Sequence, residues 1–183
     1  MEPNIDNSNI IYSKAVIEFI TVANEYCLFF EKAENYSAED IFQYFQKIAP
    51  LLYLKGSVMP EVTVNDDSFS EKFVTEEKWE AIFKALREKF GEQDIYYTHD
   101  HNYDTEEASL SDNMADIYQD MKDFIMLYQN SLIHAKENAI FEIQKLFKSH
   151  WGIRIINALK AVHQILHKHA IDPELFMDDD LTE

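Results

Sequence analysis

Residues 111–134, SDNMADIYQDMKDFIMLYQNSLIH, contain the clearest amphipathic helix pattern in the chain. At about 100° per residue, four carboxylates fall within an arc of roughly 80°. They belong to Asp112, Asp116, Asp120 and Asp123. The opposite side is apolar and carries Met114, Ile117, Met121, Phe124, Ile125 and Tyr128. The stretch therefore predicts a core helix with a stripe of aspartates along its other face.

Apolar side chains recur at three- and four-residue steps elsewhere, which predicts further helices on both sides of this stretch. Before it, residues 9–34, a segment capped by Ser37 and residues 75–90 show the pattern. Pro50 is expected to kink the second of these or to begin a new segment. Two more helices are expected after residue 134, with a turn at Trp151 and Gly152 between them and an end near residue 169.

Residues 92–109, EQDIYYTHDHNYDTEEAS, have no clear periodicity and predict a long, acidic surface loop. The chain has only 3 Gly and 4 Pro in 183 residues, which disfavours all-β folds because these need frequent turns. The expected fold class is therefore all-α: a single compact bundle of about six helices with this one long loop.

The length suits one domain, and its expected limits follow from composition. Residues 1–8 are polar and are expected to be disordered. Residues 9–169 hold the helical patterns and are expected to form the single domain. Residues 170–183 contain 6 acidic residues and no basic one, and predict a mobile acidic tail.

The net charge of −18 is unevenly distributed. Residues 61–123 hold 18 acidic and 6 basic residues, for −12, whereas residues 124–169 carry +4. A charge this negative opposes binding to nucleic acid or to anionic membranes and favours a basic partner. The sequence does not predict an oligomeric state.

The chain carries no recognisable targeting segment. It has no signal peptide pattern and no run of 18 apolar residues, and Cys27 is its only cysteine. Cys27 lies on an apolar stripe and is expected to be a buried thiol rather than a nucleophile. These features predict a cytoplasmic protein, and no cofactor is expected.

Three interpretations of the aspartate stripe stay open. The four carboxylates either face solvent or pair with cations of the same fold, or they bind a basic partner, or they hold a metal ion with histidines. The +4 of residues 124–169 favours the first. If the stripe binds a partner, its contact residues are Asp112, Asp116, Asp120 and Asp123.

Histidines provide weaker metal candidates, namely His99, His101, His163 and His167. His99 and His101 flank Asp100, and residues 100–104 resemble the start of a calcium loop without its later Gly and Glu. His163 and His167 are one helical turn apart, although histidines at a helix end also interact favourably with its negative pole. A polar loop and a helix end are the favoured interpretations.

Four segments carry a family resemblance: PLLYLKGSVMP at residues 50–60, FVTEE at 73–77, DIYQDMKDF at 116–124 and HWG at 150–152. They resemble a bacterial family known only as a domain of unknown function, over roughly residues 12–163. The resemblance implies a compact all-helical domain. It implies no activity, and no residue role transfers from it.

The leading hypothesis for function is an intracellular protein-interaction domain whose acidic surface binds a basic protein. An inhibitor or immunity-type role fits the charge by analogy. The alternative is a metal-dependent enzyme that uses the aspartate stripe with nearby histidines. Signatures for nucleotide binding, zinc proteases and di-iron bundles are missing from the sequence.

Overall fold

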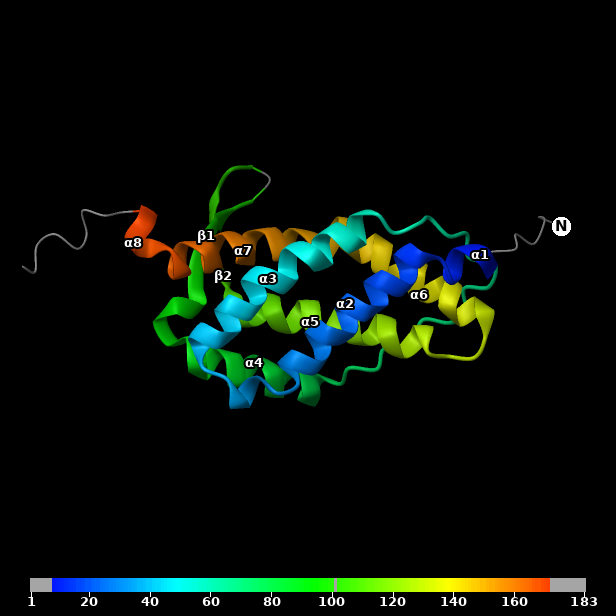
Figure 1. Cartoon of the computed structure of the whole chain (residues 1–183), viewed down its shortest axis with the longest axis horizontal. Helices are drawn as coiled ribbons and strands as arrows, with labels where there is room; N and C mark the ends of the chain where they lie inside the picture. Colours follow the sequence, from blue (N-terminus) through cyan, green and yellow to red (C-terminus); the bar gives the residue numbers. More distant parts are fainter. Residues whose placement is uncertain (1–7, 101, 172–183) are drawn as a thin grey trace, which may run out of the picture.

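Helix α5, Leu110–Tyr128, lies at the centre of the molecule and contacts α2, α4, α6 and α7 (Figure 1). The computed structural model describes residues 8–100 and 102–171. The long helices are α2 Lys14–Phe30, α3 Ala38–Ser57, α4 Glu76–Phe90, α5, α6 Ile133–Leu146 and α7 Gly152–Leu166. Short helices are α1 Ser8–Ile11, η1 Ala33–Asn35, η2 Gly91–Asp94 and α8 Lys168–Ile171. The predicted all-helical bundle is confirmed.

The core explains why α5 is central. Fourteen of its nineteen residues are buried, among them Met114, Ile117, Met121 and Phe124. Aromatic side chains from other helices meet this face, and Phe19 lies edge-on to Phe124 with ring centroids 5.2 Å apart. A helix buried on nearly every side leaves little room for a solvated acidic face.

Side-chain caps fix where several helices begin, as the sequence predicts for Ser37. Its hydroxyl accepts the backbone N–H of Asp40, and the Asp40 carboxylate accepts the N–H of Ser37, which forms a capping box. The hydroxyls of Thr75 and Ser109 cap α4 and α5 by accepting the backbone N–H groups of Lys78 and Asp112. The predicted first helix is divided, because α1 ends at Ile11 and Ser13 begins α2.

The prediction of a loop without regular structure at residues 92–109 is wrong. After η2 the segment forms an antiparallel hairpin of β1, Ile95–His99, and β2, Thr105–Ser109, at the same end of the bundle as α8 (Figure 1). Aromatic and β-branched side chains in β1 favour a strand, and Asp100 stabilises the turn by accepting the N–H groups of Asn102 and Asp104.

The predicted turn at Trp151 and Gly152 is also wrong. A single π-helical turn, η3 Phe147–Trp151, joins α6 to α7, and Gly152 is the first residue of α7. A Cβ on Gly152 would lie 2.3 Å from the carbonyl oxygen of Phe147, so glycine permits the close backbone approach instead of ending the helix. Pro50 lies inside α3, which continues to Ser57, so it does not begin a new segment.

Residues 58–75, called the strap from here on, join α3 to α4 without any helix or strand. Connections this long without regular structure are uncommon in compact domains and often have a binding role. Val62 and Val74 are buried, whereas most of the strap between them is exposed. The strap crosses the face formed by α5 and α6.

Three sequence expectations concern the chain ends and Cys27. Residues 1–7 and 172–183 lie outside the described residues, as does most of the predicted tail. Cys27 is 1% exposed, and burial raises the pKa of its thiol to about 12.

Within the described ranges, no helix combines the length and apolar character that crossing a bilayer requires.

Candidate functional site

Polar side chains of α5 and α6 hold the strap against the bundle. Gln144 of α6 donates to the carbonyl oxygens of Met59 and Pro60, near the beginning of the strap. Asn138 donates to the carbonyl of Asp66, and Glu137, which is 1% exposed, accepts from Asn65. These bonds fix the first half of the strap.

Asp123 of α5 fixes the other end of the strap. Its Oδ1 accepts the backbone N–H of Phe73 at 2.7 Å and that of Val74 at 2.9 Å. The Lys72 ammonium lies 3.6 Å from Oδ2, which is beyond hydrogen-bond distance. Asp123 is 5% exposed, and no described residue donates a hydrogen bond to Oδ2. This buried oxygen can accept from a ligand, and such oxygens are rarely left unpaired.

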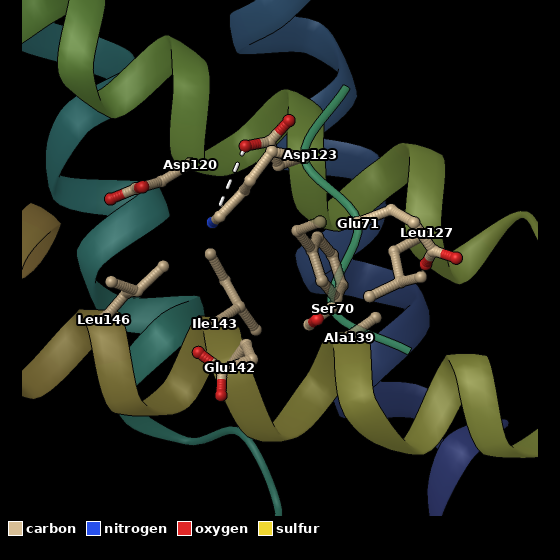
Figure 2. Close-up of a pocket in the computed structure, with 11 residues that line it drawn as sticks. Ser70, Glu71, Asp120, Asp123, Leu127, Ala139, Glu142, Ile143 and Leu146 are labelled. Carbon is tan, nitrogen blue, oxygen red and sulfur yellow. Dashed lines mark ion pairs between the residues drawn. The ribbon is translucent and has the colours of Figure 1, made fainter. Parts of the chain in front are cut away.

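A pocket of about 160 Å³ lies beneath the strap, between α5 and α6. Figure 2 shows Asp120 and Asp123 of α5 on one side and Ile143 and Leu146 of α6 on the other. Its remaining lining residues are Ser70, Glu71, Lys72, Phe124, Leu127, Ala139 and Glu142. The pocket thus places two buried carboxylates at the edge of an apolar wall.

Asp120 and Asp116 share a cluster of charges with η3 and α7. Nδ1 of His150 donates to Asp120 at 2.6 Å, and Nη2 of Arg154 lies 2.7 Å from Asp116. Asp116 also accepts from Nε1 of Trp79 at 2.9 Å. Burial opposes the charged form of Asp116, but the hydrogen bond from His150, the charge of Arg154 and the bond from Trp79 outweigh burial and lower the pKa of this carboxyl. The cluster joins α4, α5, η3 and α7.

The surroundings of His150 favour its cationic form. Hydrogen bonds to Asp116 and Asp120 raise its pKa to about 9, against the opposing effect of burial. Two carboxylates, one guanidinium and one imidazolium sum to zero charge, which a half-buried cluster favours. Nε2 of His150 lies 3.1 Å from Nε of Arg154, a distance that would suit a hydrogen bond only to the neutral ring. We favour the cation because it neutralises both carboxylates. A histidine held as a cation is a poor general base at neutral pH.

Asp112 lies at the first turn of α5, beside the hairpin. Its carboxyl is half-buried, and burial with the nearby charge of Asp116 raises its pKa. Asp112 and His99 line the same open cleft between the hairpin and α7. The four aspartates therefore face three different surroundings and do not form one exposed stripe. Their predicted role as a single partner surface stays a prediction.

The histidine candidates are dispersed. His99 is exposed on β1, and His101 lies outside the described residues. His163 is exposed in the last turn of α7 and His167 is exposed just after its end, with ring centroids 4.6 Å apart. Among residues 8–100 and 102–171, no group of three or more His, Cys, Asp or Glu side chains is placed to hold a metal ion. The metal-enzyme hypothesis stays a prediction that elemental analysis tests.

Sequence reasoning missed several residues that shape the site. Glu137 and Asn138 are buried on α6, and a polar pair beside Ala139 and Ile140 was an available signal. The role of Asp94, which is fully buried, was also missed. Its carboxylate accepts from Arg87, from Ser109 and from the N–H of Ser111, and so ties η2 to the start of α5.

Comparisons with known proteins give a family without an activity. The sequence profile described as "Domain of unknown function (DUF5063)" matches residues 10–168. A crystal structure of protein BF1032 from Bacteroides fragilis has a similar fold, with a TM-score of 0.77. The two sequences are 36% identical, and the match covers 85% of this chain and 94% of that one. No curated protein matches. The extent of the profile match and the shared helical fold show that the chain belongs to the DUF5063 family.

Proposed function

We propose that this domain is a protein-interaction module that binds a basic partner at the pocket beneath the strap. The observation that carries the proposal is the buried Oδ2 of Asp123, which accepts no hydrogen bond from a described residue and lies at the edge of an apolar pocket. A cationic side chain with an apolar stem satisfies both features, because its head pairs with the carboxylate while its stem contacts the apolar wall.

The surroundings of the pocket support a cationic ligand over an anionic one. Glu71 is exposed on the strap, and Glu142 lies across the pocket on α6. The strap adds the exposed Asp66 and Asp67, and the chain as a whole carries −18. Complementary charge accelerates the encounter with a basic protein and orients it before the pocket is filled.

The proposal narrows the partner surface expected from the sequence. Asp120 and Asp123 line the pocket, whereas Asp116 is paired with Arg154 and Trp79, and Asp112 lies near the hairpin. We place the interaction in the cytoplasm, which the single buried cysteine supports.

The proposal is tested with a fluorescent tetralysine peptide by fluorescence anisotropy at low salt. Asp123→Asn is the decisive variant, because the asparagine oxygen still accepts the N–H groups of Phe73 and Val74 while an amide replaces Oδ2. We expect its affinity to fall about tenfold, as is typical for the loss of one charge-assisted contact.

Glu88→Gln is the matched control, because it removes the same charge from an exposed position on α4. We expect it to change the affinity less than about twofold, as for other charges outside the contact. Equal losses in both variants would show attraction by net charge alone and would contradict the proposal. Absence of tetralysine binding to the unmodified protein would also contradict it.

A further inference from the structure

We infer that the pocket selects a primary ammonium on an unbranched stem, such as an unmodified lysine side chain, and that Lys72 of the strap holds the ammonium position in the free protein. The inference rests on the proposed function and adds the class of ligand and an internal competitor.

The position of Lys72 identifies it as the competitor. Its ammonium lies 3.6 Å from Oδ2 of Asp123, close enough to pair electrostatically but too far to donate a hydrogen bond. Its side chain lines the mouth of the pocket but is 59% exposed, so the ion pair is open to water. Exposed ion pairs of this kind are weak, and an incoming ammonium can replace this one.

The pocket also has room for a stem that Lys72 does not supply. Phe124, Leu127, Ile143 and Leu146 line a space of about 160 Å³. A cavity of roughly 150 Å³ with similar apolar walls accommodates a molecule the size of benzene. The four methylene groups of a lysine side chain therefore fit, and the apolar wall favours their burial.

The hydrogen bonds of the two carboxylates favour ammonium over guanidinium. Oδ1 of Asp123 already accepts two backbone N–H groups, and Oδ2 of Asp120 accepts from His150. Asp123 therefore offers one oxygen to a ligand, and the paired donors of arginine need two parallel acceptors for their best geometry. A trimethylated lysine has no N–H to donate, and an acetylated lysine has no charge.

Replacement of Lys72 leaves the rest of the strap in place. The bonds at Asp66, Phe73 and Val74 are made by backbone atoms and do not involve the Lys72 side chain. Ligand exchange at Asp123 therefore requires movement of one exposed side chain and no unfolding of the strap.

Lys72→Met tests the competitor, because methionine keeps an unbranched stem of similar length and removes the ammonium. We expect it to bind the tetralysine peptide about tenfold more tightly than the unmodified protein, as when an internal competitor occupies a site roughly nine-tenths of the time. Lys84→Met is the control, because Lys84 is an exposed lysine on α4 that pairs with Glu80, and it removes the same charge away from the pocket.

Peptide selectivity tests the ligand class in parallel. We expect tetralysine to bind the unmodified protein at least about fivefold more tightly than tetra-arginine or tetra-trimethyllysine, which carry the same charge. Lys72→Met binding no more tightly than Lys84→Met would overturn the role of Lys72. Equal affinity for the three peptides would overturn the ligand class.

The two proposals fail in different ways. One outcome is tetralysine binding that depends on Asp123 without the Lys72 effect or the peptide preference. That result would refute this inference and leave the proposed function standing. Absence of tetralysine binding to the unmodified protein would refute both.

Discussion

At the scale of single residues, His150 makes stability depend on pH. Its pKa is raised from about 6.5 when unfolded to about 9 in the cluster, so the folded protein holds this proton more tightly. The stabilisation is therefore complete below pH 6.5 and is lost as the pH rises through 9. We expect unfolding in urea to show a loss of about 2 kcal/mol across this window, less than the full shift implies because the side chain is partly exposed.

His150→Gln should flatten this pH dependence, because glutamine does not titrate. His163→Gln, which changes an exposed histidine on α7, should leave the dependence unchanged. A similar loss of stability between pH 6.5 and 9 in His150→Gln would show that another group is responsible.

The aspartates also show what the sequence could and could not predict about single residues. Helical periodicity placed Asp112, Asp116, Asp120 and Asp123 on one face of a helix. It could not supply their partners, because Trp79, His150, Arg154 and the N–H groups of the strap are distant in sequence. The +4 of residues 124–169 did indicate that cations lie near the stripe, and two of the partners, His150 and Arg154, come from that segment.

At the scale of elements, the π-helical turn η3 depends on the absence of a side chain at Gly152. We expect Gly152→Ala to destabilise the protein by about 3 kcal/mol in urea unfolding, because its Cβ would lie 2.3 Å from the Phe147 carbonyl oxygen. This steric effect opposes the higher helix propensity of alanine. An unchanged or raised stability would show that the turn relaxes freely.

Gly91→Ala provides the matched comparison. Gly91 has φ +52° and ψ −124° and no atom within 4 Å of an added Cβ, so only backbone strain of about 1–3 kcal/mol is expected there. The comparison separates steric overlap from conformational strain, which a single glycine substitution cannot do.

The elements differed in how far sequence predicted them. Ser37 and Thr75 marked helix starts correctly, because capping chemistry is local. The hairpin was missed because Tyr96 and Tyr97 are followed within a few residues by a run of polar residues, which weakens the alternation expected of a strand. The Trp151–Gly152 step was misjudged because glycine both ends helices and permits close packing, and only the position of Phe147 distinguishes the two.

At the scale of the whole molecule, a charge of −18 on a chain of 183 residues favours expansion. We expect the thermal midpoint to rise by roughly 2–5 °C between 20 mM and 500 mM NaCl, because salt screens repulsion among the exposed acids of the strap, α4 and the hairpin. A fall in the midpoint with NaCl would show that attractive ion pairs dominate.

The overall architecture could be predicted because the burial of apolar helical faces decides it, and each face shows in the spacing of apolar residues within one segment. The pocket could not be predicted, because it forms where the strap, α5 and α6 meet. Residue 72 and residue 123 are separated by fifty positions, and only the fold brings their charges together.

The burial of Cys27 has a practical consequence for following the strap in solution. A thiol with a pKa of about 12 that is 1% exposed reacts very slowly with maleimides at neutral pH. A cysteine placed at the exposed Ser70 would therefore take a fluorophore or spin label selectively in the otherwise unaltered chain. Because Ser70 lines the pocket, its signal would report the entry of a ligand, without any need to remove the native cysteine.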